Sequence, residues 1–278
     1  MRGRGAGRLA PALLLNAALV LLAAATLVPL LWMVSVSLMP AGEANVFPPA
    51  FLPSRATLAN YRELFTRLDV GRYLVNSTLV ATAVTVLSLL FNAMAGYAFA
   101  KLRFAGRERL FGLLLAALVI PTQVAMLPLF LLLRWIGLIN TYGAVVVPAM
   151  ASIFGIFLMR QFALSLPDEL LDAARIDGAS ELRIFRSVVL PLCRPVLLTL
   201  AIFTFLATWN DFTWPLVVLT DGRMYTLPIA LANLSGEHFQ DTELMMAGAV
   251  LTVAPVLLLF IALQRYYIEG ILLGSVKE

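Results

Sequence analysis

The sequence predicts an all-α membrane protein with six transmembrane helices. Of its 278 residues, 61% are hydrophobic and only 13% are charged, and the mean hydropathy is +0.92, which does not fit a soluble domain. The long apolar runs are rich in leucine and lack strict alternation, so helices explain them better than the strands of a barrel.

Six stretches are long enough to cross a hydrocarbon core of about 30 Å as helices. They are expected near residues 12–38, 74–100, 110–133, 141–160, 195–219 and 243–263. This predicts an N-terminal part at 1–72 with the first span and an outer segment, a five-helix core at 73–264, and a cytoplasmic tail at 265–278. Every span except the second contains proline, which frees a carbonyl four residues earlier and favours a bend.

The distribution of Lys and Arg predicts the orientation. With the N-terminus inside, 14 of these residues fall in cytoplasmic segments and six in outer ones, so both termini and a polar segment at 165–195 are expected in the cytoplasm. The alanines at 23–25 could pass for a signal-peptidase site. Because apolar sequence continues without a charge over residues 9–42, a retained first span is favoured over a cleaved signal.

Composition limits the chemistry open to this chain. The arginines are scattered between apolar runs and form no single basic face, which argues against a nucleic-acid partner. Cys193 and His238 are the only cysteine and histidine, so a metal site or a Ser-His triad has little material. The sequence has no P-loop and no Gly-x-Ser-x-Gly pattern, so we expect no catalytic residue, no metal and no cofactor on this chain.

The polar segment at 165–195 holds nine of the 36 charged side chains and lies between two apolar spans. Ser165 and Pro167 are typical of a helix start, and Gly178 predicts a left-handed helix end. A second helix is expected to begin near residues 177–181 and to run to Pro191. Its expected apolar face consists of Leu182, Phe185, Val188 and Val189.

The spacing of Asp172-Ala173-Ala174, Asp177-Gly178-Ala179, Phe185 and Pro191 resembles the cytoplasmic EAA loop of ABC importer permeases. These are the permease subunits of binding-protein-dependent importers of the MalG-like carbohydrate family, in which the loop forms a coupling helix that docks on the ATPase. The family's leading Glu is Asp172 here, which keeps the charge and shortens the reach. An ordinary amphipathic connector is the alternative. The resemblance implies ATPase docking by Asp168, Glu169, Asp172, Ala173, Ala174, Asp177, Gly178, Ala179, Phe185 and Pro191.

Other strings extend this resemblance from about residue 60 to residue 277. Asn60-Tyr61 and Asn76-Ser77 resemble the entry to the core of sugar-importer permeases, and residues 95–107 resemble the string and turn that follow the second span. The small residues at 95–100 predict close approach of another helix. The chain's end resembles a family tail that extends toward the ATPases, and the matching residues are Gly274, Ser275, Val276 and Lys277.

The sharpest feature inside a predicted span is the string at 209–216, which contains Asn210, Asp211, Trp214 and Pro215. A carboxylate at the bilayer centre costs about 2.5–3.5 kcal/mol, so Asp211 is expected to face the bundle interior, water or the outer interface. Pro215 frees the carbonyl of Asp211, which predicts a local helix break. Two roles stay open for Asp211: it caps the broken helix, or it lines a transport pathway. The string resembles the family's Trp-Asn-Asp/Glu-Phe motif.

The resemblance implies the type I ABC importer permease fold and an ATP-driven sugar or oligosaccharide importer in a bacterial inner membrane. The expected partners are the lipid bilayer, a second, MalF-like permease, two MalK-like ATPase subunits that bind ATP and Mg, and an extracytoplasmic solute-binding protein. Import of a polyol or glycerol 3-phosphate by the same machinery stays open. An ion-coupled secondary transporter is the rival class, but Asp211 is the only obvious intramembrane ionisable group and no repeat is clear.

Overall fold

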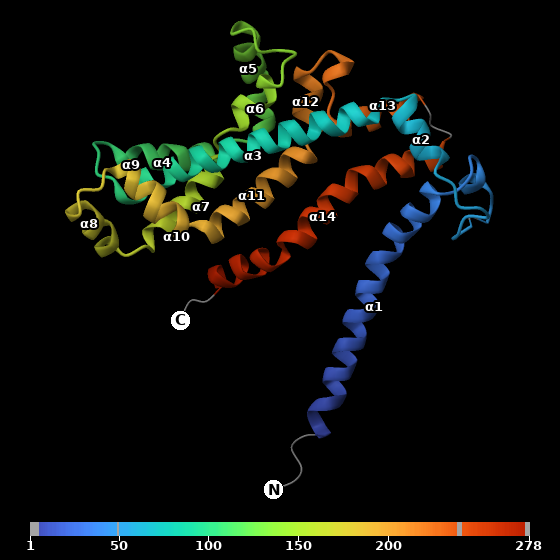
Figure 1. Cartoon of the computed structure of the whole chain (residues 1–278), viewed down its shortest axis with the longest axis horizontal. Helices are drawn as coiled ribbons and strands as arrows, with labels where there is room; N and C mark the ends of the chain where they lie inside the picture. Colours follow the sequence, from blue (N-terminus) through green and yellow to red (C-terminus); the bar gives the residue numbers. More distant parts are fainter. Residues whose placement is uncertain (1–5, 49, 238–240, 276–278) are drawn as a thin grey trace. The chain divides into compact units, whose positions relative to one another are not determined.

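The computed structural model describes residues 6–48, 50–237 and 241–275, and this part of the chain is helical without strands (Figure 1). Four stretches are long and apolar enough to cross a membrane without a sharp bend: Leu14–Ser37, Val70–Lys101, Gly143–Leu164 and Thr242–Ala262. The third consists of two helices with non-helical residues at 150–152 between them. Two further pairs are bent, Arg107–Ala117 with Thr122–Trp135 by 106° and Glu181–Leu192 with Arg194–Trp209 by 78°. If each bent pair is one span, the described residues contain six spans, as the sequence predicts.

The chain forms two compact units, and the first combines Met1–Val70 with Leu231–Ala254. Its main elements are α1 (Ala6–Ser37), η1 (Glu43–Asn45), α2 (Ala59–Thr66) and the first part of α14 (Thr242–Ser275). The side-chain amide of Asn60 in α2 donates to the carbonyls of Ser37 at 3.0 Å and Met39 at 2.9 Å. The segment after the first predicted span therefore folds back onto the end of α1. The predicted division at residues 72 and 264 follows topology rather than packing and stays a prediction.

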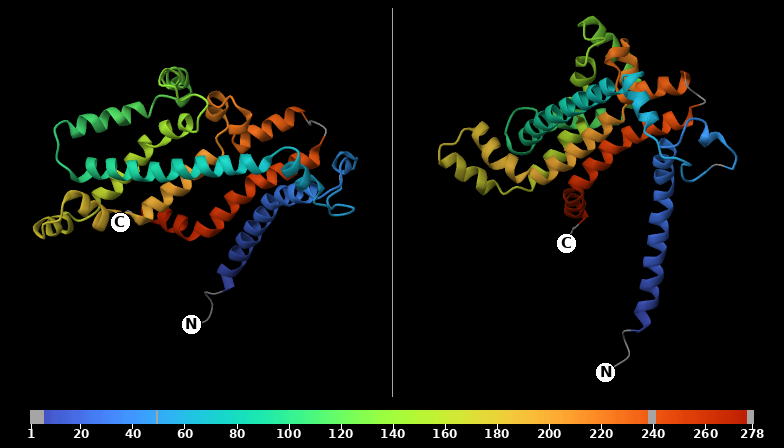
Figure 2. Two further views of the ribbon diagram at one scale, coloured as in Figure 1. Left: turned by 45° about the horizontal axis from the view of Figure 1, so that its top comes forward. Right: turned by 45° about the vertical axis from the view of Figure 1, so that its right-hand side comes forward.

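The second unit combines Gly71–Ala230 with Pro255–Glu278. Its helices in chain order are α3 (Val70–Lys101), α4 (Arg107–Ala117), α5 (Thr122–Trp135), α6 (Gly143–Ala149), α7 (Ile153–Leu164), α8 (Asp168–Ile176), α9 (Glu181–Ile184), α10 (Leu190–Leu192), α11 (Arg194–Trp209) and α12 (Thr213–Val218), with η3 (Gly222–Met224) and the start of α13 (Leu227–Glu237) after them. Ala93 of α3, Met159 of α7 and Leu200 of α11 belong to one buried cluster, so these three helices pack together (Figure 2).

Glycine permits close contact between α3 and α7. A Cβ atom added to Gly96 would lie 2.5 Å from the Cβ of Met159 and 2.9 Å from the backbone nitrogen of Arg160, which is closer than real Cβ atoms come to other atoms. The predicted close helix approach at residues 95–100 is therefore confirmed.

Two predicted spans differ in their limits. The predicted span at 195–219 is not one helix, because α11 ends at Trp209 and α12 begins at Thr213, which places the break where Asp211 and Pro215 predicted it. The last helix does not end near residue 263 but continues to Ser275. Of the predicted tail residues, Gly274 and Ser275 lie in this helix, whereas Val276 and Lys277, like His238, lie outside the described residues.

Candidate functional site

The loop between α7 and α11, residues 165–195, folds into the predicted helix, glycine turn and second helix. Gly178 adopts a left-handed φ of +79°. Its N–H donates to the carbonyl of Arg175 at 3.0 Å, and the N–H of Ala179 donates to the carbonyl of Ala174 at 3.0 Å. This pair of bonds is the Schellman arrangement that ends helices, so Gly178 fixes the angle between α8 and α9.

The predicted start of α8 at Ser165 is wrong. The Ser165 hydroxyl instead donates to the carbonyl of Phe162 at 2.7 Å, at the end of α7. Pro167 occupies the N-cap of α8 and makes no side-chain capping bond. Asp168 and Glu169 lie in the first turn, where their charge favours the positive end of the helix dipole.

The predicted apolar face of the second helix is wrong at Leu182, which is 63% exposed. Phe185 and Val189 are buried as predicted, and Val188 is half-buried. Ile184, which was not part of the predicted face, is buried as well. After α9 the backbone passes through η2 (Phe185–Val189), a π-helical turn, and its wider turn changes the register of the residues that face the core.

The α7–α11 loop attaches to the helices through its apolar side. Leu171, which is 1% exposed, lies in one buried cluster with Ile184, Phe185, Tyr97 of α3 and Met159 of α7. The rings of Tyr97 and Phe185 are 5.7 Å apart. Opposite this buried side, Ile176 is 86% exposed. The loop thus leaves a surface with polar and apolar groups uncovered in the second unit.

The ten residues predicted to dock on an ATPase divide by exposure. Ala174 and Ala179 are half-buried, and Phe185 is buried in the cluster with Tyr97, where it supports the loop from inside. The exposed ones are Asp168, Glu169, Asp172, Ala173, Asp177, Gly178 and Pro191.

An ion-pair network joins the two helices of the loop to α3. Arg175 donates from its NH1 to Asp172 Oδ1 at 2.7 Å and from its Nε to Glu181 Oε1 at 2.8 Å. Glu181 Oε2 accepts from the Tyr97 hydroxyl at 2.7 Å. Hydrogen bonds from the Arg175 guanidinium to Glu181 and Asp172 raise the pKa of Arg175, so it stays charged. The shorter Asp172, where the family has Glu, still reaches Arg175.

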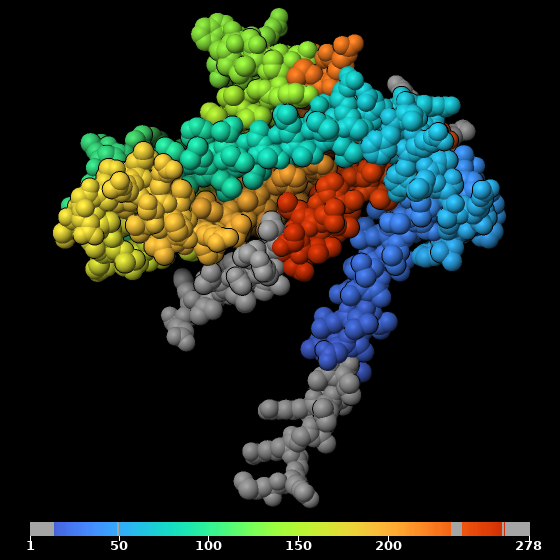
Figure 3. All heavy atoms as spheres, viewed as in Figure 1, coloured from blue at the N-terminus to red at the C-terminus, as the bar shows by residue number. Residues whose placement is uncertain are grey.

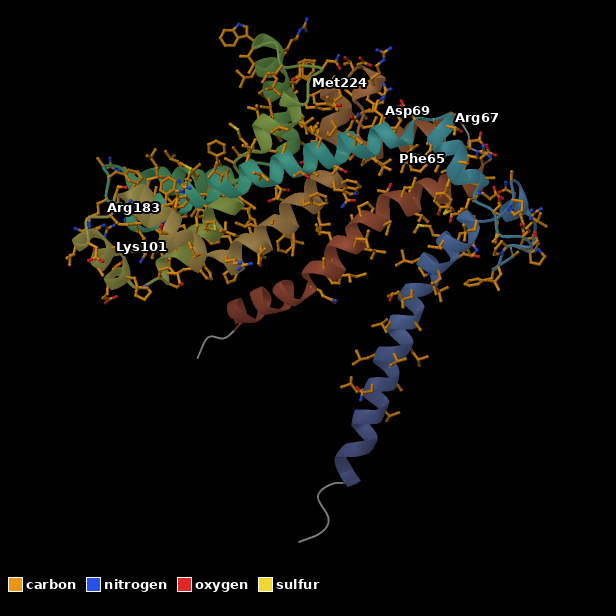
Figure 4. All side chains as sticks on the ribbon, in the orientation of Figure 1. Phe65, Arg67, Asp69, Lys101, Arg183 and Met224 are labelled. Carbon is orange, nitrogen blue, oxygen red and sulfur yellow. The ribbon has the colours of Figure 1, made fainter. Side chains whose placement is uncertain are left out.

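A second contact joins α3 to the start of α8. The Nζ of Lys101 donates to Asp168 Oδ1 at 2.7 Å and to the carbonyl of Leu166 at 2.6 Å, and its side chain is only 6% exposed. The hydrogen bond from Lys101 holds the pKa of Asp168 below its usual range. Figure 4 shows Lys101 beside the segment that carries Arg183. Between these two attachments lies a polar hollow of about 860 Å³, whose wall includes Lys101, Asp168 and Arg175.

Sequence reasoning missed the roles of Tyr97, Lys101 and Glu181. Lys101 and Asp168 are 67 positions apart, and Tyr97 and Glu181 are 84 apart. No local pattern reports such contacts. One local feature could have indicated a contact with the loop. Tyr97 and Lys101 lie one helical turn apart, on the same side of α3, at the basic end of a predicted span.

A cavity of about 430 Å³ lies among α5, α6, α11 and α12, and Gln123, Thr208, Asp211 and Trp214 are part of its lining. Asp211 Oδ1 also accepts from the backbone N–H groups of Thr213 at 3.1 Å and Trp214 at 3.3 Å, so the carboxylate caps α12. Asp211 therefore caps α12 and also lies in the lining of a cavity, and the role of this cavity in transport stays a prediction. A hollow of about 330 Å³ shares Thr208 with this cavity.

Of the other predicted pathway residues, Trp214 lines this cavity, whereas Asn210 and Pro215 are not part of its lining. The Nε1 of Trp214 donates to the carbonyl of Ala144 in α6 at 3.0 Å, which holds its ring against the lining. Pro215 is buried in the first turn of α12, where its missing N–H is not needed. Asn210 is exposed and donates to the carbonyl of Leu206 at 2.9 Å. Asn210 is not part of the cavity lining.

Side chains near the start of α3 bind the segment between α12 and α13, residues 219–226. The Nδ2 of Asn76 donates to the carbonyls of Arg223 at 3.0 Å and Tyr225 at 2.9 Å. Its Oδ1 accepts from the Tyr142 hydroxyl at 2.7 Å. Ser77 Oγ accepts from the N–H of Leu227 at 2.8 Å. Asn76 and Ser77, which the resemblance singled out, thus have a structural role in attaching α3.

Several apolar spans, an amphipathic loop attached to their ends and a lined cavity among broken helices are typical of a multi-pass membrane protein. Residues 92–272 match the family described as "Binding-protein-dependent transport system inner membrane component", and the chain belongs to this family. The predicted family and the predicted fold class are confirmed.

The relatives and a solved structure agree with this assignment. The chain is 44% identical over 254 residues to the "Arabinooligosaccharides transport system permease protein AraQ" of Halalkalibacterium halodurans, with 90% of each chain covered. It is 36% identical to the "Lactose transport system permease protein LacG" of Rhizobium radiobacter, over 80% of this chain and 81% of that one. Its fold is similar to a chain of a bacterial ABC transporter involved in the import of alginate, with a TM-score of 0.81, 24% identity, and coverage of 91% and 95%.

Proposed function

We propose that this chain is one of two permease subunits of an ATP-driven importer that translocates a sugar or oligosaccharide delivered by an extracytoplasmic solute-binding protein. The observation that carries this proposal is the similarity to AraQ over 90% of both chains, because AraQ is named for arabinooligosaccharide transport. LacG, a second relative, is named for lactose transport. A polyol or glycerol 3-phosphate is the alternative cargo.

The exposed side of the α7–α11 loop is the proposed docking surface for the ATPase. Its support is physical: Leu171 and Phe185 pack the loop against the helices from inside, while Glu169, Ala173 and Ile176 are exposed. An apolar group surrounded by charged ones is typical of a protein interface. The excess of Lys and Arg on this side of the predicted topology favours a cytoplasmic loop and cytoplasmic termini.

ATP and Mg then belong to the ATPase subunits, and this chain supplies the mechanical connection. Closure of two ATPases around ATP would displace the docked loop and favour an outward-open arrangement of the spans over an inward-open one. The nucleotide can shift this equilibrium only by its difference in affinity for the two arrangements. The chain's end, with Gly274, Ser275, Val276 and Lys277, is proposed to approach the ATPases as well.

The cavity at Asp211 is the proposed part of the sugar pathway within this chain. The amide of Gln123, the hydroxyl of Thr208, the carboxylate of Asp211 and the ring of Trp214 give it both hydrogen-bonding groups and an apolar wall. This mixture suits a sugar, which has hydroxyl groups around its ring and apolar C–H faces. Asn210 and Pro215 serve the same site by forming the break between α11 and α12.

Cross-linking tests the docking surface. Cys193 is the only natural cysteine and is buried, so a cysteine introduced at Ala173 can carry a photoreactive cross-linker alone. In membranes that contain the whole transporter, we expect Ala173→Cys to cross-link to the ATPase. The matched control is Thr220→Cys, which is also exposed and lies in the α12–α13 segment. Cross-linking of both positions, or of neither, would refute the assignment of the loop.

A binding assay tests the cargo. The solute-binding protein encoded beside this chain is titrated with arabinotriose, lactose, glycerol and glycerol 3-phosphate. Saturable binding of a sugar supports the proposal. Binding of glycerol 3-phosphate or glycerol alone would assign the same machinery to the alternative cargo.

A further inference from the structure

We propose that α3 transmits movement of the α7–α11 loop to the α12–α13 segment and the Asp211 cavity, with Tyr97, Lys101 and Asn76 as the positioning residues that fasten its two ends. This inference rests on the proposed function, because it assumes that an ATPase moves the loop. It assigns the coupling to one helix, α3, out of those that contact the loop.

At one end of α3, separate bonds hold the two helices of the loop. The Tyr97 hydroxyl binds Glu181, the first residue of α9, and the Lys101 ammonium binds Asp168, the first residue of α8. Both bonds join a donor to a carboxylate at 2.7 Å, and such charge-assisted bonds are stronger than neutral ones. Arg175 bridges the two loop helices through Asp172 and Glu181. Neither loop helix can therefore shift without pulling on α3.

At the other end, α3 is fastened to the α12–α13 segment. Asn76 is 6% exposed and uses its side chain for bonds to the backbone of Arg223 and Tyr225 and to the hydroxyl of Tyr142. Asn140 adds to the same arrangement, because its Oδ1 accepts from the N–H groups of Thr220 at 3.0 Å and Asp221 at 2.9 Å. A displacement of Asn76 would thus move the backbone of this segment directly.

The same end of α3 also packs against the helix that borders the cavity. Val80 and Val84 of α3 lie in one buried cluster with Val218 and Leu219, and Trp214 packs against this cluster. Trp214 lines the cavity and Asp211 caps its helix. Movement of α3 therefore reaches the proposed sugar pathway through direct contacts.

Between its ends, α3 is a continuous helix. Asn76 and Lys101 are 25 positions apart, which corresponds to about 38 Å along an α-helix. α3 contains no proline, whereas α5, α6 and α14 contain Pro128, Pro148 and Pro255. Figure 4 labels Lys101 at one end of α3 and Met224, in the α12–α13 segment, toward its other end. In Figure 3 the atoms of the α7–α11 loop, in yellow, gather at the same end of α3 as Lys101. An unbroken helix transmits displacement better than a bent one.

The two helices that flank the loop, α7 and α11, do not run without a break to the α12–α13 segment. The pair that contains α11 is bent by 78° at Cys193, and α11 ends at Trp209 before the cavity helix begins. α7 spans only residues Ile153–Leu164 and is separated from α6 by a non-helical break. Of the described helices that contact the α7–α11 loop, α3 is the one that extends without a break to the α12–α13 segment.

Three Tyr→Phe substitutions test the inference, because each removes a single hydroxyl. Tyr97→Phe breaks the bond to Glu181, and Tyr142→Phe breaks the bond to Asn76. Tyr61→Phe is the matched control, since its hydroxyl pairs with Ser37 in the first unit at 2.8 Å. The reporter is Thr220→Cys, whose maleimide labelling rate is measured in the complete transporter in nanodiscs, with and without a non-hydrolysable ATP analogue and Mg.

We expect the nucleotide to change the labelling rate at Thr220→Cys by about threefold or more. Loss of one bond to a carboxylate changes an equilibrium between two arrangements by roughly tenfold, so a variant without the bond should differ measurably from the parent. Tyr97→Phe and Tyr142→Phe should each lower this response to less than half, and the double variant should be no worse than either, because the two bonds act in series. Tyr61→Phe should respond like the parent. If Tyr97→Phe impairs assembly, Lys101→Met tests the same end of α3.

Three results would overturn the inference: a parent without a nucleotide response, a full response in Tyr97→Phe and Tyr142→Phe, or an equal loss in Tyr61→Phe. Co-purification of the ATPase is measured first on every variant. If the unmodified chain does not retain an ATPase, the proposed function itself is refuted. An ATPase that is retained without any effect of the α3 variants refutes only the role of α3.

Discussion

The turn at Gly178 gives the sharpest test of the α7–α11 loop. Its φ of +79° lies in the region that residues with a Cβ avoid, and no atom lies within 4 Å of a Cβ added there. The cost of Gly178→Val is therefore conformational, about 1–3 kcal/mol in the folded state. The chain can relieve this strain by giving up the bonds from Gly178 to Arg175 and from Ala179 to Ala174, which would change the direction of α9.

The matched control is Gly137→Val, because Gly137 has a φ of +74° and also has no atom within 4 Å of an added Cβ. Both substitutions should lower thermal stability by a similar amount, a few degrees for about 1–3 kcal/mol. Only Gly178→Val should lower ATPase co-purification and the number of sugar molecules imported per ATP. Gly178→Asn should restore both, since asparagine tolerates left-handed backbone. Normal import by Gly178→Val, or equal loss in Gly137→Val, would refute the reasoning.

Three further predictions concern the contacts around this loop and the cavity. Gly96→Leu places side-chain atoms where α7 already lies, so it should force α3 and α7 apart and lower the yield of folded protein. The control is Gly112→Leu, which should keep the normal yield because no atom lies within 4 Å of a Cβ added at Gly112. Equal yields of the two variants would contradict the close approach of α3 and α7. Asp211→Ala should lose the cap of α12 and lower the free energy of unfolding by about 0.5–2 kcal/mol, whereas Asp211→Asn should keep the cap. Import by Asp211→Asn then reports whether the negative charge is needed for transport. An Asp211→Ala variant as stable as the parent would contradict the capping role. Because Lys101 lowers the pKa of Asp168, the stabilising effect of this pair is fully present above about pH 4 and is lost as the pH falls through the lowered pKa. The difference in melting temperature between the parent and Asp168→Asn should therefore stay constant from about pH 5 to 8. A change of this difference within that range would contradict the assignment of the pair.

Features that depend on a few neighbouring residues could be predicted from the sequence. The left-handed turn at Gly178 follows from the absence of a Cβ, and the break at Asp211 follows from a nearby proline and a capping carboxylate. The number of spans follows from the length of the apolar runs. Each of these signals lies within one continuous stretch of sequence, so no tertiary information was needed.

The attachments of α3 could not be predicted in this way. Tyr97 binds Glu181 and Lys101 binds Asp168 across long sequence separations, and nothing in either local sequence selects its partner. The error at Leu182 has a different origin. A constant helical period put Leu182 on the core side, but the π-helical turn at 185–189 changes the period, and no residue type marks such a turn in advance.

Reconstituted uptake tests the central claim most directly. The complex of this chain with its partner permease and the ATPase is placed in proteoliposomes, and import of arabinotriose is measured with the solute-binding protein outside and ATP with Mg inside. The account predicts uptake that stops when either ATP or the binding protein is left out and that needs no ion gradient. Uptake driven by an ion gradient through this chain without an ATPase would contradict it.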